Sequence, residues 1–107
     1  MQWEQITAAD PRIAALAAAA VGAVLDGENP HRAYSDAKPY IEVLVGLRVA
    51  DPTAGRPPTA LRRRYAQAIT VAEAGPDVAW PDARRVYDLA CRQILDLAVG
   101  AAEWSIA

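Results

Sequence analysis

Residues 13–25 read IAALAAAAVGAVL and carry no charge over thirteen positions. The larger apolar residues and two alanines recur at helical spacing: Ile13, Leu16, Ala17, Ala20, Val21, Val24 and Leu25. This spacing predicts an α-helix with one face in a core. The opposite face is small rather than polar, because it carries alanines and Gly22. A helix that is apolar all round has to be covered, either at the centre of a bundle or at a contact between chains.

Clear start and stop signals flank this helix. Asp10 can cap free backbone amides, and Pro11 suits the first helical position because its missing N–H would have gone unbonded there. The helix is predicted to run to about Asp26, and Gly27 can adopt the left-handed conformation that ends a helix. A turn and then a loop or short helical turn are expected over residues 28–35.

Residues 40–49 fit two structures. Five apolar residues alternate with other residues as they would in a β-strand: Ile41, Val43, Val45, Leu47 and Val49. The segment also satisfies helical spacing, with Asp36 and Pro39 as a helix start and residues 51–52 as its end. We favour the helix, because the chain holds no second good strand and a lone strand leaves its hydrogen-bonding edges unpaired. The alternative is an α+β fold whose strand pairs across an obligatory dimer.

Two further helices complete the predicted fold. Thr59 is a reasonable N-cap for the third helix, and residues 75–76, Gly-Pro, end it. Pro81 opens the last helix, which reaches about Val99 or beyond. The alanine-rich composition favours helix as well, because alanine loses no side-chain entropy there. We therefore predict one all-α domain over residues 1–107, with about four main helices packed as a small bundle or an orthogonal array.

The net charge and the cysteine content limit the classes of partner and the cellular compartment that we expect. The formal net charge is −2 and the isoelectric point is about 5.3, so no global field attracts nucleic acid or an anionic membrane. A single cysteine, Cys91, excludes an internal disulfide and fits a reducing compartment, so we expect a cytoplasmic protein. The N-terminus lacks the basic start of a signal peptide, and residues 13–25 are too short and alanine-rich to span a bilayer.

An arginine cluster is the most specific polar feature. It comprises Arg56, Arg62, Arg63 and Arg64, and no acid lies between Pro52 and Ala72. Three consecutive arginines on a helix fan over about 200°, so one neighbour cannot neutralise them all. They could bind phosphate while Tyr65 stacks on a base, although the acidic isoelectric point argues against nucleic acid. They could also bind an anionic partner protein, bind an anionic metabolite in a pocket with Tyr65 and Tyr40, or simply form a solvated helix face.

The last predicted helix carries a ladder of charges. Arg84, Asp88, Arg92 and Asp96 alternate in sign every four residues. Such a ladder is typical of a face in water, which places four residues toward protein: Tyr87, Cys91, Ile94 and Leu95. Cys91 is then expected to act as a small buried apolar residue rather than as a nucleophile.

Signals for catalysis and metal binding are weak. His31 is the only histidine and is expected in a loop, and a Ser–His–Asp set compressed into residues 31–36 cannot form a triad. With one histidine and one cysteine, only carboxylates could complete a metal site, and the spacing around Asp26 and Glu28 is not that of a calcium loop. We therefore expect no catalytic residue, cofactor or metal, and lean against an enzyme.

The predicted function is binding to another protein, most simply to a second copy of this chain. A helical domain buries one stripe per helix, whereas residues 13–25 offer nearly the whole circumference. The predicted contact residues are Ala15, Ala18, Ala19 and Gly22, with Trp3 and Trp104 at element ends. The competing interpretation is that this helix is enclosed by the other helices of its own domain.

Overall fold

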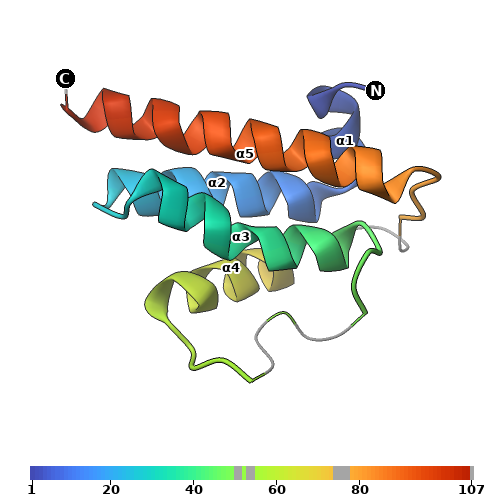
Figure 1. The fold of residues 1–107 in the computed structure, drawn as a ribbon, viewed down its shortest axis with the longest axis horizontal. Helices are drawn as coiled ribbons and strands as arrows, with labels where there is room; N and C mark the ends of the chain where they lie inside the picture. Colours follow the sequence, from blue (N-terminus) through green and yellow to red (C-terminus); the bar gives the residue numbers. More distant parts are fainter. Residues whose placement is uncertain (50–51, 53–54, 74–77, 107) are drawn as a thin grey trace.

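The computed structural model describes residues 1–49, 52, 55–73 and 78–106, with side chains through Trp104. Within those ranges the chain forms five helices: α1 Trp3–Ala9, α2 Pro11–Leu25, α3 Pro30–Leu44, α4 Ala60–Val71 and α5 Ala83–Ile106 (Figure 1). The same ranges contain no strand. The predicted all-α class is confirmed, and the α+β alternative is wrong.

Helix α2 occupies the centre of the arrangement. It packs against each of the other four helices, whereas α4 packs only against α2 and α3, and α1 only against α2 and α5. Figure 1 shows α2 and α5 running in the same direction and α3 running in the opposite one. The neighbouring helices therefore cover much of the apolar circumference of α2, as the competing interpretation of residues 13–25 requires.

The limits of α2 are those that the sequence predicts. Asp10 is its N-cap and accepts a hydrogen bond from the Arg12 backbone N–H at 3.0 Å, with Pro11 at the first helical position. Asp26 is the C-cap, and the following Gly27 has a φ of 109°, the left-handed region that glycine tolerates best.

A short helix precedes α2 and was not predicted. Gln2 and Gln5 form a capping box at the start of α1, and the Asp10 backbone N–H bonds the Ile6 carbonyl at 2.9 Å where it ends. The chain then turns by 114° into α2. Among the described residues, no single helix is long and apolar enough to cross a membrane, and only the bent pair of α1 and α2 reaches that length and composition together.

Helix α3 begins at Pro30, six residues before Asp36 in the predicted start, so residues 31–35 belong to this helix rather than to the predicted loop or short helical turn. The Asn29 side chain accepts from the backbone N–H groups of His31 and Arg32, and Pro30 takes the first helical position. Pro39 stands inside the helix rather than at its start. The physical reason is that residues 29–30 carry the same cap-and-proline signal as Asp10 and Pro11.

The end of α3 resolves the ambiguity of residues 40–49. The segment is helical only through Leu44, and Gly46 then takes a φ of 88°. The backbone N–H of Leu47 bonds the Glu42 carbonyl at 2.8 Å, which closes the helix. The apolar residues after Val45 do not continue the core, and Val49 is exposed. The predicted end of this helix at residues 51–52 is therefore wrong, because residues 45–49 are already outside the helix.

Helices α4 and α5 match their predicted starts within two residues. Thr59 caps α4 and accepts from the Arg62 backbone N–H at 3.1 Å. Helix α4 ends at Val71, while the predicted end at residues 75–76 lies outside the described residues. Helix α5 begins at Ala83, two residues after Pro81, and continues well beyond Val99.

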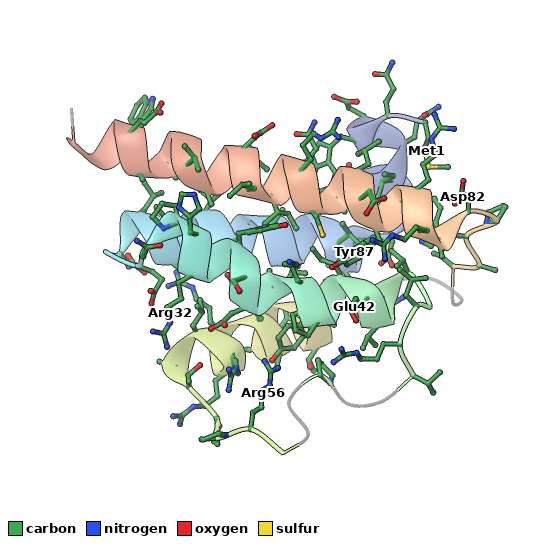
Figure 2. The ribbon with its side chains drawn as sticks, viewed as in Figure 1. Met1, Arg32, Glu42, Arg56, Asp82 and Tyr87 are labelled. Carbon is green, nitrogen blue, oxygen red and sulfur yellow. The ribbon has the colours of Figure 1, made fainter. Side chains whose placement is uncertain are left out.

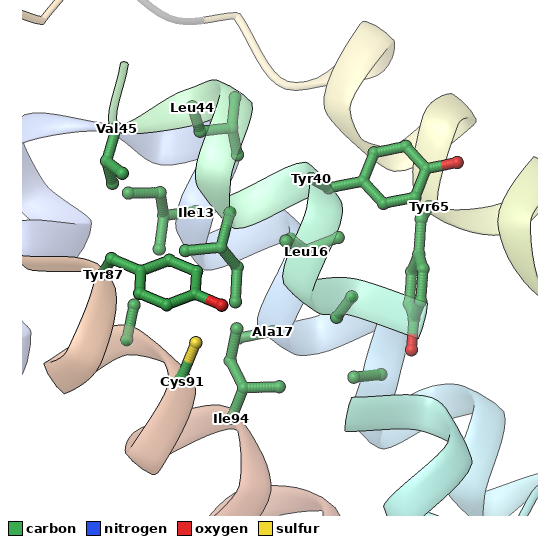
Figure 3. Close-up of a cluster of buried hydrophobic side chains, with 14 of the residues drawn as sticks. Ile13, Leu16, Ala17, Tyr40, Leu44, Val45, Tyr65, Tyr87, Cys91 and Ile94 are labelled. Carbon is green, nitrogen blue, oxygen red and sulfur yellow. The ribbon is translucent and has the colours of Figure 1, made fainter. Parts of the chain in front are cut away.

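Alanines form much of the core. Ala20, Ala37 and Ala90 come from α2, α3 and α5 respectively, and none has exposed surface. Larger side chains fill the space between them, among them Ile13, Leu16, Tyr65 and Ile94 (Figure 3). A second small cluster joins Val24, Ala33, Ala98 and Ala101 at the end of the bundle where α2 ends and α3 begins. Because these side chains are small, the helix backbones can approach one another closely.

Candidate functional site

A groove between α2 and α4 brings together three of the predicted contact residues. Ala15, Ala18 and Ala19 line it from α2, and its volume is about 510 Å³. The α4 side contributes Gln67, Ala68, Val71 and Ala72, with Arg64 at one end. The Val71 side chain is 72% exposed, a large fraction for an apolar residue in a helix. The groove is therefore an open surface built mainly from small apolar side chains.

The α4 half of this groove was not among the predicted contact residues. Ala68, Val71 and Ala72 follow one another at helical spacing, and no charge occurs between Arg64 and residue 73. That spacing was the available signal, because it places the three residues on one side of α4. The spacing alone could not show that this side of α4 lies next to the alanines of α2.

Gly22 lies against Arg64 of the same chain. A Cβ atom at residue 22 would stand 2.8 Å from Arg64 Nη2, closer than real Cβ contacts. Arg64 Nη1 donates to Asp26 Oδ2 at 2.8 Å, so the guanidinium crosses from α4 over Gly22 to the end of α2. In this structure the missing side chain of Gly22 makes room for an intrachain ion pair. Gly22 does not line the groove.

The two predicted tryptophans lie apart from the groove. Trp3 is half-buried in α1, packs against the core, and lines a hollow with Leu89 and Gln93 of α5. Trp104 is 82% exposed in the last turn of α5. Neither tryptophan lines the α2–α4 groove, so the predicted contact residues do not form one continuous surface.

The arginine cluster does not converge on one point. Arg62 donates to the Pro57 carbonyl at 2.9 Å, and Arg64 is engaged with Asp26. Arg56 lies on the segment before α4 (Figure 2), and Arg63 is exposed on α4. Among the described residues, Arg56 and Arg63 form no ion pair. Two of the four arginines are thus engaged by groups of the same chain, Arg62 by a carbonyl and Arg64 by a carboxylate.

Tyr65 has no ring face for a base or a ligand. The side chain is fully buried, and its hydroxyl donates to the Ala33 carbonyl at 2.6 Å. Burial raises the pKa of Tyr65, and the nearby Asp36 carboxylate raises this pKa further. Tyr40 packs edge-on against Tyr65, with ring centroids 5.8 Å apart, and its hydroxyl donates to the Arg62 carbonyl. Both tyrosines hold α4 to α3, and both rings are buried.

The charge ladder of α5 faces water as predicted. Arg84, Asp88, Arg92 and Asp96 are all exposed, and Arg84 Nε lies 3.4 Å from Asp88 Oδ1. The residues on the inner side, Tyr87, Cys91 and Ile94, are buried.

Tyr87 and Cys91 are both buried, and Figure 3 shows the Tyr87 hydroxyl directed toward the Cys91 sulfur. Burial raises the pKa of the Cys91 thiol, while the Tyr87 hydroxyl and the Lys38 ammonium act in the opposite direction.

We expect Cys91 to react slowly with iodoacetamide at neutral pH. The thiolate is the nucleophile, and each unit by which the pKa rises lowers the thiolate fraction about tenfold. Alkylation should be about tenfold slower or more than in urea-unfolded protein, and the rate should rise as the pH is increased. Mass spectrometry gives this rate directly, because Cys91 is the only cysteine. Equal rates for folded and unfolded protein at pH 7 would contradict the burial of the thiol.

The structure also shows where the candidate residues for catalysis and metal binding lie. His31 is exposed in the first turn of α3 rather than in the predicted loop. Among the side chains that the structure describes, no three of His, Cys, Asp and Glu lie close enough together to hold a metal ion. Comparison of the chain with protein-family models, with curated proteins and with solved structures found no match. The function is therefore argued from the geometry.

Proposed function

We propose that this chain is a small, non-enzymatic cytoplasmic protein that binds a second copy of itself through the α2–α4 groove. The observation that carries the proposal is the open, uncharged surface of Ala15, Ala18 and Ala19 beside the exposed Val71. The compartment is inferred from the single cysteine, which leaves no internal disulfide to form.

Small side chains suit this surface for contact with another helix. Alanines let two helix backbones approach closely, and van der Waals contact then extends along both helices. The middle of α2 carries no charge between Arg12 and Asp26, and Arg64, the charged residue that lines the groove, is already paired with Asp26. Removal of apolar surface from water contributes about 25 cal/mol for each Å² covered.

A second copy is the occupant that this shape favours. In a two-fold contact the same patch faces itself, so each protrusion must meet a hollow of the same patch. Here the exposed Val71 stands beside the hollow over Ala18, on the same face of the molecule. Val71 of each copy can therefore enter the hollow of the other copy, which would cover the most exposed apolar side chain of α4.

We expect Ala18→Arg to convert a dimer into a monomer. Ala18 is exposed in the middle of α2, so arginine should leave the helix intact while placing an unpaired charge in the contact. The dissociation constant should rise about a hundredfold or more, because covering an unpaired charge costs several kcal/mol. Size-exclusion chromatography with light scattering over a concentration range measures the change, and circular dichroism checks the helix content.

Ala66→Arg is the matched control. Ala66 is also an exposed alanine within a helix, but it does not line the groove. This variant should dimerise like the unaltered protein. A protein that is monomeric at every concentration, or an Ala18→Arg variant that still dimerises, would refute the proposal. Gly22 is less suitable for this test, because a side chain there displaces Arg64 from within the same chain.

A further inference from the structure

A second groove runs between α3 and α5, and its lining residues come from neither α2 nor α4. Its volume is about 520 Å³, within the range of small-molecule sites. Tyr34 and Lys38 line it from α3, while Tyr87, Cys91 and Leu95 line it from α5. No residue of this groove lines the α2–α4 groove. The two surfaces can therefore be tested independently.

The lining of this groove combines polar atoms with aromatic and aliphatic carbon. The partly exposed Tyr34 ring and Leu95 side chain offer flat and branched hydrocarbon surface, and the buried Tyr87 ring adds a small exposed part. The Tyr87 hydroxyl points toward the Cys91 sulfur (Figure 3). Burial raises the pKa of both Tyr87 and Cys91, which keeps these two groups uncharged at neutral pH.

The rim of the groove carries more positive than negative charge. Lys38, Arg84 and Arg92 line it together with one acid, Asp88, which pairs with Arg84 at 3.4 Å. Lys38 and Arg92 form no ion pair with any residue that the structure describes. The nearby Glu42 is paired with Arg48 at 3.0 Å. Two cations are thus left to meet an anion.

Of the three cationic side chains that line the groove, Lys38 and Arg84 lie over aromatic rings. Lys38 Nζ lies 5.3 Å from the centre of the Tyr34 ring, and Arg84 Cζ lies 5.3 Å from the centre of the Tyr87 ring. Such contacts fix long side chains that otherwise lose considerable rotamer freedom on binding. The cationic rim is therefore partly ordered before any ligand arrives.

We propose that the α3–α5 groove binds a small aromatic carboxylate. Its carboxylate would lie between Lys38 and Arg92, and its ring system would pack against Tyr34, Tyr87 and Leu95. Charge-assisted hydrogen bonds from the two cations supply orientation, and the carbon surface of the groove supplies apolar contact.

Other occupants fit this groove less well. Inorganic phosphate would use the cations but leave the carbon surface of the groove in water. A nucleic acid strand would follow α5 past Asp88 and Asp96, whose carboxylates repel phosphate. A metal cation would meet Lys38 and Arg92 at the rim. An organic anion with an apolar body uses both parts of the groove.

The first test titrates 2-naphthoate into ¹⁵N-labelled protein and follows amide chemical shifts. Saturable shifts should appear at Tyr34, Lys38, Cys91 and Arg92. The neutral analogue 2-naphthalenemethanol should bind about tenfold more weakly or worse, because it lacks the carboxylate that the cations bind. The aromatic acid should also slow alkylation of Cys91 in a saturable way.

Variants identify which charges matter. The double variant Lys38→Gln/Arg92→Gln should lose about tenfold or more in affinity for 2-naphthoate, whereas Arg85→Gln, an exposed arginine of α5 outside the groove, should not. Ala18→Arg should bind 2-naphthoate unchanged, which separates this site from the proposed dimer contact. Circular dichroism confirms that each variant is folded. Absence of saturation, shifts confined to other surfaces, or equal affinity in the double variant would overturn the proposal.

Discussion

Replacement of Tyr65 by alanine should lower the free energy of unfolding by about 3–5 kcal/mol, as expected for deletion of a large buried aromatic side chain. Tyr65 is one of the two residues by which α4 enters the core, the other being Leu61. Its ring packs edge-on against Tyr40, and its hydroxyl bonds the Ala33 carbonyl at 2.6 Å. Alanine would leave a cavity between α3 and α4 and remove one of the two tyrosine hydrogen bonds that join these helices.

Tyr65→Phe separates these two contributions. It keeps the ring and removes only the hydroxyl, so the loss should be about 1 kcal/mol. Urea denaturation monitored by circular dichroism measures both variants. Tyr34→Phe is the control, because the Tyr34 hydroxyl makes no hydrogen bond with the residues that the structure describes. If Tyr65→Ala were as stable as Tyr34→Phe, the docking of α4 through this ring would be wrong.

Replacement of Asp10 by alanine should cost about 1.5–3 kcal/mol, the range for hydrogen bonds that involve a charged group. Asp10 is fully buried, and its carboxylate accepts from the Arg12 backbone N–H at 3.0 Å. The same carboxylate accepts from Arg12 Nε at 3.1 Å and from Arg12 Nη2 at 3.3 Å. Asp10 also ends α1, so one residue sets both the cap of α2 and the turn between the helices.

Asp10→Asn distinguishes the cap from the ion pair. Asparagine caps helices about as well as aspartate, so this variant should retain more stability than Asp10→Ala while losing the charge opposite Arg12. Thermal and urea denaturation give the two losses. The reverse order, with Asp10→Asn less stable than Asp10→Ala, would show that the cap is not what Asp10 contributes. Combining each change with Arg12→Gln isolates the side-chain pair.

Local signals account for the parts of the fold that could be predicted. Asp10 with Pro11 and Thr59 set helix starts through contacts within three residues, and these positions are correct. The same signal at residues 29–30 was interpreted as a turn, which moved the predicted start of α3 too late. Helix α1 was missed because seven residues and a glutamine capping box are a weak pattern. The end of α3 depends on Gly46. This end was not predicted, because the apolar pattern of residues 40–49 continues past that glycine.

The candidate sites depend on contacts that no local pattern contains. Gly22 was predicted as a contact between chains, but the guanidinium of Arg64, from another helix, lies over it. Tyr65 was predicted beside the arginines as a possible stacking ring, yet it points inward to Ala33. The exposure of the α5 ladder was predicted correctly. Its position beside Lys38 and Tyr34 was not, because the pairing of α3 with α5 joins residues far apart in the chain.

The attachment of α4 connects the stability of the fold with the proposed contact surface. This helix packs on α2 and α3 alone among the described helices, and it buries only Leu61 and Tyr65. Elements with so few buried residues open at a lower free energy than the rest of a fold, as a sub-global cooperative unit. The α2–α4 groove exists only while α4 is docked. A phenol ring that never meets solvent is therefore expected to govern whether the proposed contact surface is present at all.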